Sequence, residues 1–160
     1  MFQYSRCLVF ALLLVISGCA YGKYFPKPGD QFLTHPFGMD IYNKSGIDFG
    51  TKDWERIFPV VGDAYIDLLG CVGKIGWPVE EGIKNTSIII LPPEPIEGKP
   101  VTVGAFVYPG FLFVREDFFY ISLIRHEWLH VYLFLSGERS GGDPEHKDLI
   151  FTRCPVAPGY

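Results

Sequence analysis

The strongest periodic pattern of apolar residues lies between Thr51 and Val72. Apolar side chains recur there every three or four positions, as on one face of an α-helix, and they are Trp54, Ile57, Phe58, Val61, Tyr65, Leu68, Leu69 and Val72. Thr51 is the expected N-cap, and Gly73 follows the last apolar position. Because Pro59 has no N–H to donate, we expect a kink or a restart near it. The pattern predicts a scaffold helix.

Three short apolar runs in the middle of the chain predict β-strands. Residues 86–91 are rich in β-branched side chains and precede Pro92-Pro93, as expected for a buried strand. Residues 103–108 and 111–115 follow, separated by Pro109-Gly110, which predicts a turn. The aromatic side chains of these runs suit sheet packing, with a substrate groove as the alternative.

A second helix is predicted over residues 118–135. Asp117 is its expected N-cap and Gly137 its expected C-terminal stop. The helix is apolar on nearly all sides, which predicts that it is buried. Two helices with a short mixed or antiparallel sheet between them indicate an α+β fold.

The N-terminal segment has the pattern of a signal peptide. Arg6 supplies a positive charge, an apolar run extends from Leu8 to Ile16, and Ile16-Ser17-Gly18-Cys19 follows. These four residues resemble the lipobox of bacterial lipoproteins, which implies cleavage after residue 18 and lipid on Cys19. We therefore expect a signal peptide over 1–18, a lipidated tether over 19–38 and one domain over 39–160. An ordinary secretory signal is the alternative.

Composition narrows the partners and the compartment. The net charge is −4, and no Lys/Arg cluster follows the signal, so nothing favours nucleic acid as a partner. Apart from Cys7 and Cys19, the chain contains only Cys71 and Cys154. In an oxidising compartment this pair predicts a disulfide, with two buried thiols as the alternative.

The candidate chemistry lies in His126-Glu127-Trp128-Leu129-His130, the H-E-x-x-H pattern. On a helix, histidines at i and i+4 share one face, and neutral imidazoles suit Zn²⁺. Glu127 would take a proton from water at the metal's open position. Polar groups on a buried helix are costly unless they are paired or metal-bound. Histidines bonded to backbone or carboxylates are the alternative.

A catalytic zinc takes three protein ligands. His146, in the glycine-rich segment after the helix, is the predicted third ligand. Asp143 and Glu145 are the alternatives, since carboxylates also bind zinc. Either could instead orient a ligating imidazole through a hydrogen bond without binding the metal itself.

Residues 125–146, with the strand-before-helix order upstream, resemble the zincin metallopeptidases. More narrowly, they resemble small bacterial lipoproteins with H-E-x-x-H followed by G-D-x-x-H. The resemblance implies a small zincin-like domain whose upstream strand binds an extended peptide. The metzincin pattern would require Gly and His at Leu133 and Ser136. Aspzincins use a downstream aspartate, which keeps Asp143 open as a ligand.

The sequence therefore predicts a monomeric, membrane-anchored zinc metallopeptidase of the bacterial cell envelope. Its partners would be a peptide or protein substrate and, through Cys19, the membrane; Ala20 favours the outer membrane in a Gram-negative cell. Tyr132 and Arg139 are candidate donors to the oxyanion. The alternative function is a non-catalytic binding or adaptor lipoprotein whose metal site is structural or vestigial.

Overall fold

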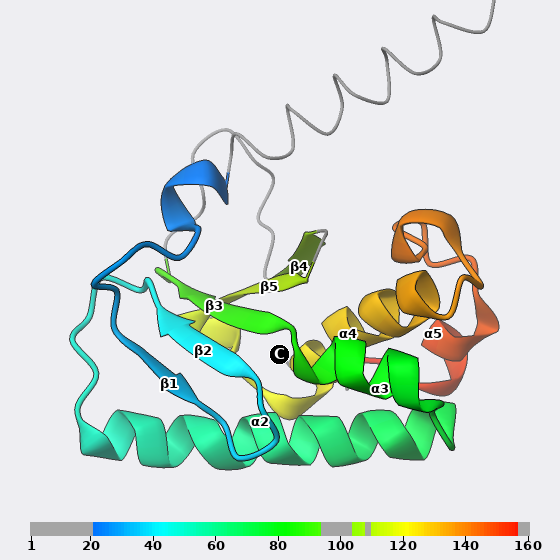
Figure 1. The fold of residues 1–160 in the computed structure, drawn as a ribbon, viewed down its shortest axis with the longest axis horizontal. Helices are drawn as coiled ribbons and strands as arrows, with labels where there is room; N and C mark the ends of the chain where they lie inside the picture. The colour runs from blue at the N-terminus through cyan, green and yellow to red at the C-terminus, as the bar shows by residue number, and fades with distance from the viewer. Residues whose placement is uncertain (1–20, 94–103, 108–109, 157–160) are drawn as a thin grey trace, which may run out of the picture.

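The computed structural model describes residues 21–93, 104–107 and 110–156 (Figure 1). The expected signal peptide over 1–18 and Cys19, the expected lipidation site, lie outside these residues. The helices of the described part are α2 (Thr51–Val72), α3 (Trp77–Lys84), α4 (Ile121–Leu135) and α5 (Leu149–Arg153). Three 3-10 helices are η1 (Gly22–Tyr24), η2 (Glu116–Phe118) and η3 (Ser140–Gly142). No helix of the described residues has both the length and the apolar character needed to cross a membrane.

Five strands form one mixed sheet, and they are β1 (Phe32–Thr34), β2 (Asp40–Asn43), β3 (Ser87–Leu91), β4 (Gly104–Val107) and β5 (Phe111–Arg115). Their order is β1-β2-β3-β5-β4. The three inner strands run parallel to one another, whereas the outer strands β1 and β4 pair antiparallel with β2 and β5. The predicted α+β class and mixed sheet are confirmed, and β4 forms one edge of the sheet.

The sheet separates a large core from a small one, because successive side chains of a strand point to opposite faces. Ile88, Ile90 and Val114 face the helices and join the main core with residues of α2, α3 and α4. On the other face, Ile89 and Phe113 pack with Tyr21 in a smaller cluster. Figure 1 shows α2 along the lower side of the molecule and η1 on the opposite side of the sheet.

Both predicted helices begin at other residues than expected. Gly50, not Thr51, is the N-cap of α2, because the Asp53 carboxylate accepts the Gly50 N–H at 2.9 Å. Helix α4 begins at Ile121, not at Phe118. Asp117 does not cap it, because both carboxylate oxygens of Asp117 accept hydrogen bonds from the Arg115 guanidinium at 3.0 and 2.5 Å.

Helix α2 continues through Pro59 as one element, so the restart considered there does not occur. The pyrrolidine ring lies on the exposed side of the helix. The structure also contains the predicted disulfide between Cys71, at the end of α2, and Cys154, just after α5. This bond joins the scaffold helix to the C-terminal segment.

Several elements were not predicted from the sequence. Strands β1 and β2 and helices α3 and α5 are all short, between three and eight residues. Strand β1 and helix η1 lie within residues 19–38, for which we expected a tether. The described part of that segment therefore belongs to the sheet and to the smaller core.

Candidate metal centre

Three histidines from two segments meet at one point. His126 and His130 lie one turn apart on α4, and His146 comes from the segment between η3 and α5. The Nε2 atom of His146 lies 3.0 Å from Nε2 of His126 and 3.2 Å from Nε2 of His130. One ligand atom of each residue lies within 4.8 Å of the other two. The structure thus brings together the three histidines proposed as ligands, close enough to bind a metal.

Trp128 fixes the rotation of α4. Its side chain is fully buried in the main core. The indole N–H donates to Thr86 Oγ1 at 3.0 Å, and the Thr86 hydroxyl donates to the Ile83 carbonyl at 2.6 Å. These bonds hold the Trp128 face of α4 at the end of α3 and the start of β3, so His126 and His130 lie on the other side of the helix.

The loop that carries His146 has an unusual backbone. Asp143 and His146 both have positive φ, 62° and 53°, a conformation that is costly for residues other than glycine. Asp143 stabilises the loop: its carboxylate accepts the Asp148 N–H at 2.6 Å and its carbonyl accepts the His146 N–H at 3.0 Å. The buried Asp143 carboxylate therefore shapes the segment that presents His146.

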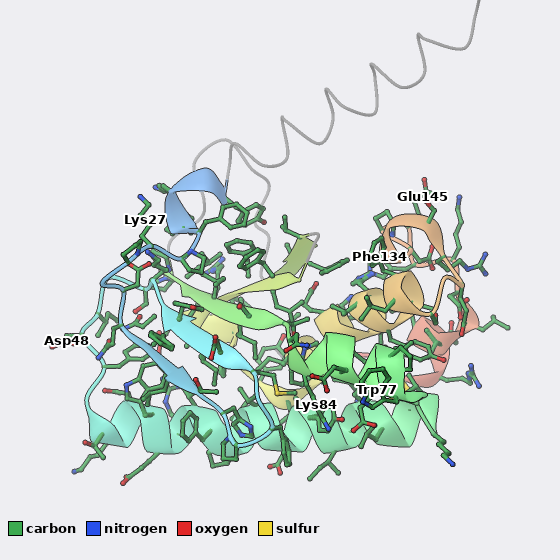
Figure 2. The ribbon with its side chains drawn as sticks, in the orientation of Figure 1. Lys27, Asp48, Trp77, Lys84, Phe134 and Glu145 are labelled. Carbon is green, nitrogen blue, oxygen red and sulfur yellow. A yellow bond between two sulfur atoms is a disulfide. The ribbon has the colours of Figure 1, made fainter. Side chains whose placement is uncertain are left out.

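Neither carboxylate considered as the third ligand is in the histidine cluster. The Asp143 carboxylate is bound to the backbone as described, and Asp143 and Glu145 are absent from the group of residues within ligand distance. Glu145 is exposed and forms an ion pair with Lys147. Figure 2 shows Glu145 at the outer end of its loop. The described geometry favours His146 as the third ligand.

Hydrogen bonding sets the tautomer of His130. Its Nδ1 atom lies 2.7 Å from the carbonyl oxygen of Gly142. A carbonyl only accepts, so Nδ1 carries the proton and Nε2 presents its lone pair to the other two histidines. This is the usual way in which a protein orients a ligating imidazole.

Burial keeps two of these imidazoles neutral. It is the main cause that lowers the pKa of His126 to about 4, and the neighbouring His130 and His146 lower that pKa further. Burial also lowers the pKa of His130. The hydrogen bond to the Gly142 carbonyl raises this pKa, but burial has the larger effect. A metal binds only the neutral form of imidazole, so His126 and His130 are ready to bind at neutral pH.

The spacing of the nitrogens fits zinc. Three nitrogens bound to a tetrahedral Zn²⁺ at about 2.0–2.1 Å would lie about 3.3 Å from one another. The two Nε2–Nε2 distances of 3.0 and 3.2 Å are close to that value. The cluster therefore has the donor set and the size of a metal site.

Glu127 lies beside the cluster in a dry environment. Its side chain is buried, and burial raises the pKa of the carboxyl to about 8, while the Phe106 backbone N–H bonds the carboxylate and lowers the pKa. Strand β4 approaches closely here: a Cβ added at Gly104 would lie 2.7 Å from Glu127 Oε1. The carboxylate therefore occupies space that only a glycine at position 104 leaves open.

A cavity of about 510 Å³ opens in front of these residues. Its lining comes from β4, α4, the loop around η3 and the C-terminal segment, and includes Gly104, Ala105, Phe106, Tyr120, His126, Glu127, His130, Pro144 and His146. Tyr132 and Arg139, the candidate oxyanion donors, do not line it. They bond to Glu138 at 3.1 Å and to Asp148 at 3.1 Å instead. Tyr120 is the tyrosine at the cavity wall.

Phe151 packs against all three histidines. Its ring centroid lies 5.1, 4.7 and 4.7 Å from those of His126, His130 and His146. Phe151 belongs to α5 and does not line the cavity. Sequence reasoning missed this residue, since a five-residue helix has too little pattern to detect.

Arg125 and the disulfide hold α5 in place. The buried Arg125 guanidinium donates to Asp67 of α2 at 2.5 Å, to the Cys154 carbonyl at 3.3 Å and to the Pro155 carbonyl. The bond from Cys154 to Cys71 ties the same segment to α2. The residue next to the first histidine thus joins the scaffold helix to the segment that carries Phe151.

Comparisons with known protein families, with curated proteins and with solved structures found no match. The functional interpretation therefore depends on the residues and geometry of the site.

Proposed function

We propose that the protein is a zinc-dependent hydrolase with a zincin-like site, most simply a metallopeptidase anchored to the bacterial cell envelope. One observation carries the proposal. The three histidines and the buried carboxylate of Glu127 line one cavity, so a metal, a general base and a substrate would meet there.

The residues divide the chemistry between them. His126, His130 and His146 would hold Zn²⁺, which when bound supplies a Lewis acid that brings the pKa of a water molecule near 7. Glu127 would accept a proton from the attacking water and give it to the leaving amine. Burial raises the pKa of the Glu127 carboxyl, so that its ionised form is a stronger base than an exposed carboxylate.

A free cavity face supports a catalytic rather than a structural site. Phe151 packs against the three imidazoles without lining the cavity, whose wall includes all three histidines. A closed structural site would need a fourth ligand, whereas Asp143 is bonded to the backbone and Glu145 to Lys147. These contacts favour the enzyme over the non-catalytic lipoprotein, which stays the alternative.

The edge strand β4 favours a peptide as the substrate. An extended peptide can add to an exposed sheet edge through backbone hydrogen bonds. Among the described strands, β4 pairs only with β5, and Gly104, Ala105 and Phe106 line the cavity. A peptide paired with β4 would therefore pass in front of Glu127. The chain would act as a monomer, without nucleic acid.

The proposal is tested by peptide hydrolysis with the purified full-length protein in detergent. A mixture of quenched fluorescent peptides serves as the probe, with and without added Zn²⁺. Glu127→Gln keeps the shape of the side chain and should lower the rate by about 10²–10⁴-fold. Glu145→Gln, the same change at an exposed site beside His146, should leave the rate within about twofold. Equal rates for the wild type and Glu127→Gln would remove the proposed base.

A further inference from the structure

The described N-terminal residues pack on the sheet face opposite the helices. Tyr21 is buried, and its ring lies 4.6 Å from that of Phe113. The Phe25 ring lies 5.0 Å from Phe111 and 5.3 Å from Phe113. Tyr21, the first residue that the structure describes, therefore lies at the outer face of the sheet.

This position leaves almost no tether. Cys19, the proposed lipid attachment site, precedes Tyr21 by two residues, and two residues span at most about 7 Å. A flexible tether of the twenty residues expected from the sequence would have a root-mean-square length of about 25 Å. If Cys19 carries lipid, this short connection keeps Tyr21, and with it the outer face of the sheet, close to the bilayer surface.

The same face leads directly to the cavity. Phe113, which Tyr21 contacts, is the register partner of Ala105 across the β5–β4 pair. Ala105 packs with the outer-face cluster and also lines the cavity. Partners in an antiparallel pair lie about 5 Å apart at Cα. Tyr21 is thus connected to the cavity wall through one ring contact, with Phe113, and one strand pair, Phe113 with Ala105.

The side chains around η1 suit a lipid headgroup layer. Lys23 and Lys27 are exposed, and the Lys23 ammonium lies 4.8 Å from the ring centroid of Tyr24. Figure 2 shows Lys27 on the same side of the sheet as η1, opposite α2. Lysines with tyrosine and phenylalanine are favoured at a membrane interface, where the amines face lipid phosphates.

We propose that the domain lies directly on the bilayer through η1 and the outer face of its sheet, with the cavity rim beside the headgroups. Its substrates are then peptide segments held at the membrane surface, belonging to membrane-embedded or lipid-anchored proteins. The membrane orientation depends on lipid at Cys19, and the substrate class depends in addition on the proposed hydrolase function.

The orientation is tested without catalysis. Full-length protein carrying Lys23→Cys or Lys52→Cys is labelled with a fluorophore and reconstituted into phosphatidylethanolamine–phosphatidylglycerol vesicles that contain a headgroup-linked quencher. Lys52 is exposed and belongs to α2, which lies on the opposite side of the sheet from η1 (Figure 1). Quenching should be several-fold stronger at position 23, and a twenty-residue Gly/Ser insertion between Ala20 and Tyr21 should remove most of the difference. Equal quenching at both positions in the uninserted protein, or failure to stay with the vesicles, would overturn the orientation.

The substrate class is tested with one quenched peptide mixture, either free in solution or attached to vesicle lipids through a short linker. The reconstituted protein should cleave the attached peptides several-fold faster, and the Gly/Ser insertion should reduce this preference. Cleavage of both forms at the same rate would overturn the substrate class. If neither form is cleaved and Glu127→Gln behaves as the wild type, the hydrolase proposal fails, while the quenching result still decides the orientation.

Discussion

The Nδ1 atom of His130 lies 2.7 Å from the carbonyl oxygen of Gly142, and the two residues also touch through their backbones. A Cβ added at Gly142 would lie 2.3 Å from the His130 carbonyl oxygen. The loop after α4 therefore packs on the helix at the turn that carries the second histidine. Glycine permits both the approach and the hydrogen bond that orients the imidazole.

Gly142→Ala should weaken the site and the fold together. We expect a loss of about 1–3 kcal/mol in the free energy of unfolding, because the added methyl group overlaps backbone that cannot move aside. Zinc affinity should also fall, since the loop carries His146. Urea unfolding and competition with a chelator measure the two effects.

Gly137→Ala is the matched control for that substitution. Gly137 and Gly142 have nearly the same positive φ, 74° and 73°, but a Cβ at Gly137 meets no atom within 4 Å. Gly137→Ala should therefore lose only the stability that a non-glycine residue loses at positive φ, and its zinc affinity should be unchanged. Equal losses of affinity in both variants would contradict the role of the His130–Gly142 contact.

Gly104→Ala should impair catalysis while zinc stays bound. The new methyl group would lie 2.7 Å from Glu127 Oε1, and the flexible carboxylate is the group that would move. We expect kcat to fall at least about tenfold, since a displaced base no longer reaches the reacting water. Gly110→Ala, whose added Cβ would meet nothing closer than 4.0 Å, is the control. Unchanged kcat in Gly104→Ala would show that the position of Glu127 does not matter.

The parts of the site that the sequence predicted depend on local spacing. The four-residue spacing of His126 and His130 predicts that they share one face of a helix. His146 could be proposed as the third ligand because it is the one histidine downstream of them. The contact of Gly104 with Glu127 depends instead on how β4 packs on α4, which no local pattern encodes. Likewise, Asp117 has the residue type of an N-cap, but the nearby Arg115 engages its carboxylate.

Short elements escaped prediction for a similar reason. Helix α3 has only eight residues and contains Gly82, which lowers helix propensity in a helix interior. In the structure, a Cβ at Gly82 would lie 2.6 Å from Leu135 Cδ1, so the glycine allows α3 to approach α4. Tertiary packing stabilises this helix where local propensity does not. The long helix, the buried strand β3 and the disulfide pair carried stronger signals.

The stability of the metal-free protein should depend on Glu127 above pH 6.5. Burial raises the pKa of this carboxyl in the folded state to about 8, above its ordinary value of 4.5. Its contribution to stability is therefore complete below pH 4.5 and is lost as pH rises through 8, by up to about 1.4 kcal/mol per pH unit. Glu127→Gln does not titrate and should remove this loss.

Thermal unfolding in EDTA between pH 6.5 and 9 measures the effect. This range avoids the opposite contribution of His126, whose lowered pKa of about 4 makes stability fall as pH drops below 6.5. The difference in Tm between Glu127→Gln and the wild type should grow as the pH rises towards 8 and level off above it. Parallel curves would contradict the burial of an ionisable carboxylate at this position.

Phe151→Ala should lower zinc affinity through loss of the support behind the imidazoles. Removing a buried phenylalanine typically costs about 3–5 kcal/mol of stability, so folding is verified first by circular dichroism. Phe151→Leu keeps an apolar side chain there and should recover much of the affinity. Leu149→Ala changes a residue of the same helix that is 74% exposed, and it should bind zinc as the wild type does. Equal affinity in all four proteins would remove Phe151 from a positioning role.

Metal stoichiometry tests the central claim most directly. Full-length protein, dialysed against a weak chelator and then analysed for metal, should retain one equivalent of zinc. Glu127→Gln and Glu145→Ala should also retain it, whereas His126→Ala, His130→Ala and His146→Ala should each lose it. Less than about a tenth of an equivalent in the wild type, or full retention in His146→Ala, would contradict a zinc centre built from these three histidines.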